Sequence, residues 1–273
     1  MKRYRNSWSR FSLVLLSLVV AFAMLCSACL PWRRPQMPPG HNAEPPAPSQ
    51  TVHRVLFIHG WQGLVKDFSH YYPAAVERLP AHCEIYIVTG LSNTMGGLDD
   101  NNDTVVDEIE TFLDSNNIPL ENLHIVAHSM GGLAARRFVT RHPGAARQVF
   151  LLGTPRGGVR AFHGVNLSGW CTPSCIDDFN AANPPAPIVE CFVVAGNHYR
   201  SRGSGAFWER LPNDGLISPS IVLHFLDLCG DSVQVTARVG NLTHPDWNWG
   251  ANLLRSEKVV SWVIDRIEED LVK

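Results

Sequence analysis

Short apolar runs alternate with segments of helical spacing from residue 52 to residue 273. The runs are rich in Val and Ile and stay apolar on both faces for much of their length, which is typical of parallel strands covered by helices on both sides. Most of them end at a glycine or a turn. Six runs are therefore predicted to be strands: residues 54–60, 84–90, 122–129, 148–155, 188–196 and 233–240.

Helical patterns lie between several of these strands. Residues 103–113 offer Asp103 as an N-cap followed by apolar residues on one face, and residues 256–272 repeat the arrangement from Ser256. The alternation of strands and helices predicts an α/β sandwich. Residues 156–187 show no such spacing, so we expect a loop-like, short cap insertion there.

The N-terminus has a different pattern from the rest of the chain. In residues 1–29, basic residues precede an apolar run of about 15 residues, which is shorter than the roughly 20 that a membrane-spanning helix needs. This is the layout of a signal peptide. Residues 30–51 are rich in proline and lack apolar periodicity, as in an extended linker. The folded domain is therefore placed at residues 52–273.

The end of the signal segment, "LCSAC", resembles a bacterial lipobox. The resemblance implies lipidation of Cys29, although Cys26 stands where the pattern prefers Leu. An ordinary secretory signal cut after Ala28, or an uncleaved anchor, remains the alternative. In each case we expect an exported protein of the bacterial cell envelope, lipid-anchored or secreted, with the membrane surface as a partner.

Composition narrows the classes of partner. The formal net charge of −2 gives no electrostatic reason to expect nucleic acid. Of the seven cysteines, Cys171 and Cys175 are close enough in "CTPSC" for a local disulfide, and Cys191 is expected to be a buried strand residue. The cysteine spacings do not match a zinc pattern, so neither a metal nor a cofactor is expected.

Ser129 stands between a predicted strand and a helical pattern over residues 130–141. One physical reason for a serine at such a strand-to-helix turn is that a nucleophile is held there with its hydroxyl exposed, with small neighbours that let two backbones cross closely. Ala127 and Gly131 supply them. We interpret Ser129 as a catalytic nucleophile rather than as a structural turn residue.

Three motifs occur in the order found in α/β-hydrolases, and residues 52–273 resemble that superfamily, in particular its small bacterial secreted lipases and esterases. "AHSMGG" resembles the nucleophile elbow, with Ala127 in place of the usual first glycine. "LFIHGWQG" resembles the oxyanion loop, and "LLGTPRGG" the strand after the elbow. The resemblance implies an α/β-hydrolase fold with a mostly parallel sheet of about six strands.

A serine needs a base and an orienting carboxylate. We expect His244, in the polar loop after the last predicted strand, to be the base, because this fold places its base there. The resemblance implies that Asp214 in "LPNDGLIS" is the acid; alternatively Asn213, Asp214 and Gly215 only form a tight turn. The rivals are His198 and His224 for the base, and Asp227, Asp231 and Asp246 for the acid.

When the serine attacks, negative charge develops on the carbonyl oxygen of the ester, and two backbone N–H donors are expected to stabilise it. Met130, directly after the serine, and Trp61, in the oxyanion loop, are expected to supply them. His59 and His128 are interpreted as structural. The predicted activity is hydrolysis of small-molecule or lipid carboxylic esters, with no cofactor. The alternatives are a catalytically silent domain that binds partners at a surface, or a thioesterase or acyltransferase with the same triad.

Overall fold

The computed structural model describes residues 51–60, 63–91, 98–156, 161–162, 165–166, 173–183, 189–196, 235–240, 242 and 252–273. Within them, six strands form one sheet in the order β2-β1-β3-β4-β7-β8. Every neighbouring pair in that sheet is parallel. The strands are β1 His53–Ile58, β2 Cys83–Ile87, β3 Leu123–His128, β4 Ala146–Leu152, β7 Glu190–Gly196 and β8 Val235–Gly240. The predicted parallel sheet is confirmed.

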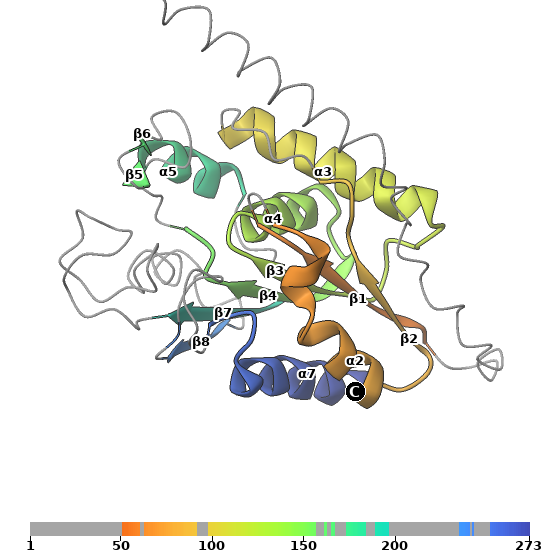
Figure 1. Ribbon diagram of the computed structural model, residues 1–273. Coiled ribbons are helices and arrows are strands. Elements are labelled where there is room, and N and C mark those ends of the chain that lie inside the picture. The colour runs from red at the N-terminus through yellow and green to blue at the C-terminus, as the bar shows by residue number, and fades with distance from the viewer. Residues whose placement is uncertain are drawn as a thin grey trace, which may run out of the picture. The chain divides into compact units, whose positions relative to one another are not determined.

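Helices cover both faces of the sheet. Figure 1 shows α3 (Leu98–Ser115) and α4 (Gly131–Arg141) on one face, and α2 (Tyr71–Arg78) and α7 (Glu257–Leu271) on the other. A short 3-10 helix, η1 (Val65–Phe68), precedes α2. This three-layer arrangement explains why the strands are apolar on both faces.

Alternate residues of each strand face two separate cores. In β1, Leu56 and Ile58 pack under α3 and α4, whereas Val55 and Phe57 pack under α2 and α7. The same alternation repeats along β3, β4 and β7, because successive strand side chains point to opposite faces. Any residue of these strands can therefore be assigned to one face by its position.

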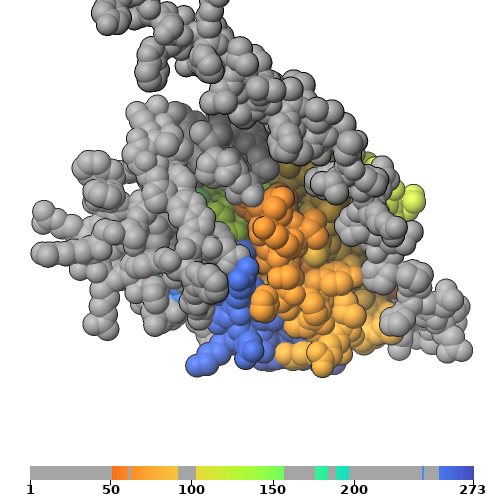
Figure 2. All heavy atoms as spheres, viewed as in Figure 1, coloured from red at the N-terminus to blue at the C-terminus, as the bar shows by residue number. Residues whose placement is uncertain are grey.

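Ion pairs connect the two helices of the α7 face. One Arg78 Nη2 atom on α2 lies 2.6 Å from carboxylate oxygens of both Asp265 and Glu268 on α7. In Figure 2 the orange and blue segments of these two helices adjoin. Both acids are exposed, so we expect these pairs to orient the helices more than to stabilise them.

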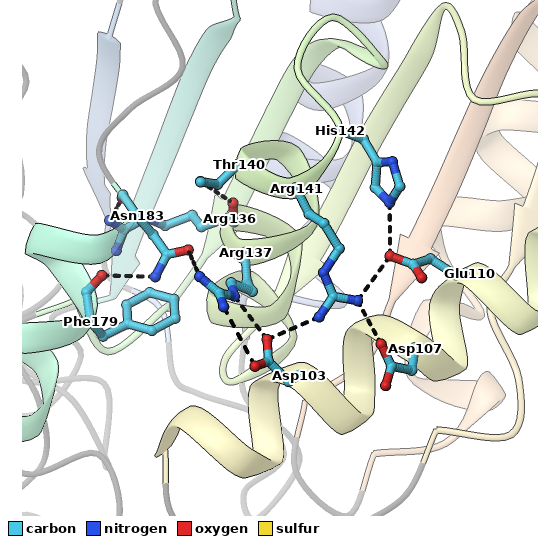
Figure 3. Close-up of polar contacts among 10 residues, drawn as sticks. All are labelled: Asp103, Asp107, Glu110, Arg136, Arg137, Thr140, Arg141, His142, Phe179 and Asn183. Atoms are coloured by element: carbon cyan, nitrogen blue, oxygen red, sulfur yellow. Dashed lines mark hydrogen bonds and ion pairs between the residues drawn. The ribbon is translucent and has the colours of Figure 1, made fainter.

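The opposite face carries a larger polar network between α3, α4 and α5 (Pro173–Ala182), shown in Figure 3. Arg141 of α4 contacts Asp103, Asp107 and Glu110 of α3. Asp103 also accepts from Arg137 Nε at 2.8 Å. Arg137 holds the pKa of Asp103 below its ordinary value despite partial burial.

Two predictions about helices are wrong. The helix expected from Asp103 begins at Leu98, and Asp103 lies within it, bound to arginines rather than capping. Residues 173–182, expected to be loop-like, form α5, and β5 (Ala161–Phe162) pairs with β6 (Val165–Asn166) in the same insertion. By contrast, Ser256 is the N-cap of α7 as predicted, although its side chain makes no capping hydrogen bond.

Several predictions lie outside the described residues. They are the signal segment 1–29 with Cys29, the linker 30–51 except for Thr51, and Cys171 of the suggested disulfide. Cys191 is described and is a buried, free cysteine of β7, as expected. No helix in the described part of the chain is long and apolar enough to span a bilayer.

Candidate active site

Ser129 lies in the tight turn between the end of β3 and the start of α4. Its φ angle is +53°, in the left-handed region that side chains other than Gly, Asn and Asp rarely adopt. The other non-glycine residues with positive φ in the described ranges are Asn117 and Asn122, for which this conformation is common. A serine held in this way stores about 1–3 kcal/mol of backbone strain, and such strain clusters at functional sites.

Backbone hydrogen bonds fix the serine on both sides. Its N–H donates to the carbonyl of Leu152 at 2.8 Å, which extends the pairing of β3 with β4 by one residue. Its own carbonyl accepts from the N–H of Gly132 at 3.0 Å, which begins the first turn of α4. The turn therefore belongs to both the sheet and the helix, and the two elements together hold the strained φ angle.

Glycines allow other backbone segments to reach this turn. A Cβ added at Gly131 would lie 2.4 Å from the His59 carbonyl oxygen and 2.8 Å from that of Ile58. A Cβ at Gly60 would lie 2.7 Å from Ser129 Cβ and 3.4 Å from Ser129 Oγ. The loop after β1 thus passes directly against the serine side chain, at a distance that only glycine permits.

The loop after β1 is held by its own histidine. His59 is buried, and its Nδ1 lies 2.9 Å from the Gly60 carbonyl oxygen. A Cβ added at Gly63 would lie 2.8 Å from both His59 Cβ and His59 Nδ1, so the loop folds back closely over the ring. This geometry agrees with the interpretation of His59 as structural.

The second glycine after the serine makes a different contact. A Cβ at Gly132 would lie 1.9 Å from Oγ1 of Thr154, a fully buried residue just beyond β4. Sequence reasoning did not assign Thr154 any role. The only signal for it was its place in "LLGTPRGG", directly after the strand that pairs with β3.

Met130 is the N-cap residue of α4, directly after Ser129. The first amide groups of a helix have no carbonyl partner within it, and the helix dipole places partial positive charge there. The backbone of Met130 is therefore placed where it could stabilise negative charge that develops near Ser129 Oγ.

The remaining predicted site residues lie outside the described part of the chain. These are Trp61, Asp214 and His244. The structure does describe Gly60, the residue before Trp61, which contacts Ser129. It also describes β8, the strand before His244, which ends at Gly240. Because the sheet is parallel, β8 ends at the same edge as β3, where Ser129 lies.

Among the described residues, one cluster has the composition of a metal site. It comprises His53, His124 and Asp270, all buried. Because His53 and His124 are at the start of β1 and β3, the cluster lies at the opposite edge of the sheet from Ser129. It is not part of the serine site.

Comparisons with known proteins agree with this geometry. Residues 48–168, which include the β1 loop and the Ser129 turn, match a family described as "Putative serine esterase (DUF676)". No curated protein matches the chain by sequence.

Solved structures with the same fold are numerous but distant in sequence. A metagenomic carboxyl esterase is 16% identical, with a TM-score of 0.52 over 87% of this chain and 82% of its own. Est1E from Butyrivibrio proteoclasticus is 13% identical, with a TM-score of 0.52 over 82% of this chain and 90% of its own. A "predicted CIB-like hydrolase" from Thermoplasma acidophilum is 12% identical, with a TM-score of 0.51 over 82% and 89%. With its parallel sheet, its Ser129 turn and these similarities, the chain has the α/β-hydrolase fold.

Proposed function

We propose that the protein hydrolyses carboxylic esters, with Ser129 as the nucleophile. The observation that carries the proposal is the strained φ angle of Ser129 in a turn where Gly60 lies against its side chain. Strain of this kind has no use in a turn that only connects a strand to a helix, because a glycine there would remove it.

Two further residues complete the proposed triad. His244 takes the proton of Ser129 as the serine attacks the ester carbonyl, and returns it to the leaving alcohol. Asp214 orients the imidazole and stabilises its protonated form. The parallel end of β8 at the serine edge supports the assignment of His244, and the order Ser, Asp, His along the chain is that of this fold.

The oxyanion that forms on the carbonyl oxygen is stabilised in the proposal by the backbone N–H groups of Met130 and Trp61. The position of Met130 at the start of α4 supports the first donor. The contact of Gly60 with Ser129 supports the second, because Trp61 is the next residue. Removing one such donor costs roughly 3 to 4 kcal/mol of transition-state stabilisation.

An active-site label tests the nucleophile. The wild-type protein is treated with a fluorophosphonate probe and assayed with p-nitrophenyl esters of increasing acyl length. We expect labelling at Ser129 and turnover of at least part of the ester series, because only an activated serine reacts with the probe. The variant Ser129→Ala should lose both signals. Ser69→Ala, at an exposed serine just after η1, is the matched control and should keep both.

The supporting residues are tested in the same assay. His244→Ala should lose nearly as much activity as Ser129→Ala, because members of a triad act as a unit. Asp214→Asn should also be strongly impaired. Labelling that persists in Ser129→Ala would refute the nucleophile. Normal activity in Asp214→Asn, with a large loss in Asp227→Asn or Asp231→Asn, would move the acid to another residue.

A further inference from the structure

A row of polar side chains crosses the sheet at the N-terminal ends of four adjacent strands. Each row residue lies two positions before a residue of the core under α2 and α7, so the row is on that face. In register, His124 is opposite Gln148, and Gln148 is opposite Glu190. The row consists of His53, His124, Gln148 and Glu190, and the next residues along these strands on this face are apolar.

Hydrogen bonds along the row fix which nitrogen of His124 carries the proton. The amide of Gln148 donates to Glu190 Oε2 at 3.0 Å and to the carbonyl of Arg266 at 3.1 Å. Its oxygen, 2.9 Å from His124 Nδ1, must therefore accept from that nitrogen. His124 Nε2 is left with a lone pair, directed toward His53 Nδ1 at 3.0 Å.

The last turn of α7 brings a carboxylate to the same point. Asp270 is 5% exposed, and its Oδ2 lies 3.9 Å from His124 Nε2. One ligand atom from each of His53, His124 and Asp270 lies within 4.8 Å of the others. Two imidazoles and a carboxylate are ligands that Zn²⁺ accepts.

The spacing of these groups is close to that of a zinc site. With zinc–ligand bonds of about 2.0 to 2.2 Å, tetrahedral ligand atoms are about 3.3 to 3.6 Å apart. The observed separations of 3.0 and 3.9 Å lie on either side of that range. The two imidazole centroids are 5.3 Å apart, and on a tetrahedral zinc ion they would be about 5.2 Å apart. The third pair of ligand atoms, from His53 and Asp270, lies within 4.8 Å, so the rings and the carboxylate must shift inward to reach a common ion.

Burial and hydrogen bonding determine which nitrogen atoms are available to an ion. His124 is fully buried with Nδ1 bound to Gln148, so its Nε2 presents a lone pair, and His53 Nδ1 donates to that lone pair when no ion is bound. Arg147 Nε is 2.5 Å from Asp270 Oδ2 and Nη2 is 3.0 Å from Oδ1, which keeps the carboxylate ionised and in place despite its burial. Arg147 also shares that carboxylate with any bound ion, so the affinity should be moderate.

We propose that His53 Nδ1, His124 Nε2 and one carboxylate oxygen of Asp270 form a structural zinc site, with water as the fourth ligand. Without the ion, the neutral His53 carries its proton on Nδ1, where it donates to His124 Nε2. When the ion binds Nδ1, this proton moves to Nε2 of His53 by exchange with water, and no net proton is released. Gln148 is the outer partner that orients His124, as carbonyl and carboxylate oxygens commonly do for metal-binding histidines. The site connects the last turn of α7 to the starts of β1 and β3.

The proposed zinc site lies far from Ser129, where ester hydrolysis is proposed to occur. The segment of β3 from His124 to Ser129 spans about 16 Å at the rise of a parallel strand. The ion is therefore too far away to act on a substrate at Ser129, and its expected effect is on stability.

Zinc titration of untagged full-length protein, stripped with a chelator, tests the proposal. We expect one equivalent of zinc to remain after desalting, by elemental analysis, and the melting temperature to rise with zinc concentration. His124→Gln and Asp270→Asn should lose both effects. Gln148→Leu keeps all three ligands and should weaken zinc binding about 10- to 100-fold.

His142→Gln is the matched control, because His142 is partly buried and paired with Glu110 on the other face. It should bind zinc like the wild type. The proposal is overturned if the wild type retains no zinc, or if Gln148→Leu and a folded His124→Gln both bind it unchanged, since the ion would then be held by other histidines. Should His124→Gln not fold, the wild-type titration and Gln148→Leu decide the question.

Discussion

The contact between Gly60 and Ser129 leads to a sharp prediction for Gly60→Ala. A Cβ at this position would lie 2.7 Å from Ser129 Cβ and 3.0 Å from the His128 carbonyl oxygen. Carbon atoms in contact are normally about 3.5 to 4.0 Å apart, so the two segments must separate by about 1 Å. The displaced atoms are the nucleophile and the loop that leads to Trp61.

The effect on stability and the effect on activity should differ in size. Overpacking of this kind costs about 1 to 3 kcal/mol, which leaves a domain of ordinary stability folded. A misplacement of about 1 Å at the reacting atoms costs about 100-fold in rate. We therefore expect Gly60→Ala to lose about 100-fold in kcat/KM on a short p-nitrophenyl ester, and to label slowly with the fluorophosphonate.

Gly90→Ala is the matched control. Gly90 has a φ angle of +82°, and a Cβ there would meet nothing within 4 Å. The substitution should cost about 1 to 2 kcal/mol through backbone strain alone, with unchanged kcat/KM. The reasoning would be refuted by a Gly60→Ala protein that is destabilised to a similar extent but keeps the wild-type kcat/KM.

Two further predictions concern the α3, α4 and α5 face. Arg136 is buried and donates to Asn180 Oδ1 and to the Asn183 carbonyl, both at 2.7 Å, so Arg136→Met should lower the free energy of unfolding by about 3 kcal/mol in urea denaturation. Arg137 on the same helix is partly exposed, so Arg137→Met should lower it by only about 0.5 to 1 kcal/mol. Equal losses in the two variants would contradict this. Arg137 depresses the pKa of Asp103 below its ordinary 3.8, so the ionised carboxylate stabilises the fold above that pH. The difference in the free energy of unfolding between wild type and Asp103→Asn should therefore shrink as the pH falls through the depressed pKa. A difference that grows on acidification would refute this prediction.

The strands were predictable because the same physical requirement acts along their whole length. Strands covered on both faces must be apolar on both faces, so β1, β3, β4 and β7 were visible as apolar runs. The Ser129 turn was visible for a related reason, since its small neighbours are the sequence trace of a close backbone approach. The partner in that approach, Gly60, is part of "LFIHGWQG", but its contact with Ser129 depends on the register of β1 and β3.

Helix α5 was missed because polar contacts hold much of its buried side. Among residues 176–182 of the helix, Ile176 and Phe179 are the buried apolar residues, whereas Asn180 is buried with Arg136. Hydrophobic periodicity cannot reveal a face whose partner is a guanidinium group. The prediction of Asp103 as an N-cap was wrong because a carboxylate that suits an N-cap also suits an ion pair within a helix.

The two ends of the sheet show why some parts of such a chain are predictable and others are not. At the Ser129 end, the requirement is steric, and sterics leave a local trace in small residues at fixed spacing, as in the segment from Ala127 to Gly132. At the opposite end, His53, His124 and Asp270 meet from positions far apart in the chain, and each alone is an ordinary residue at the end of a strand or helix. Only the parallel register and the return of α7 over the sheet bring them together. A polar group buried at such a point must be satisfied by a partner or a ligand, so the zinc titration also tests which of the two this fold uses.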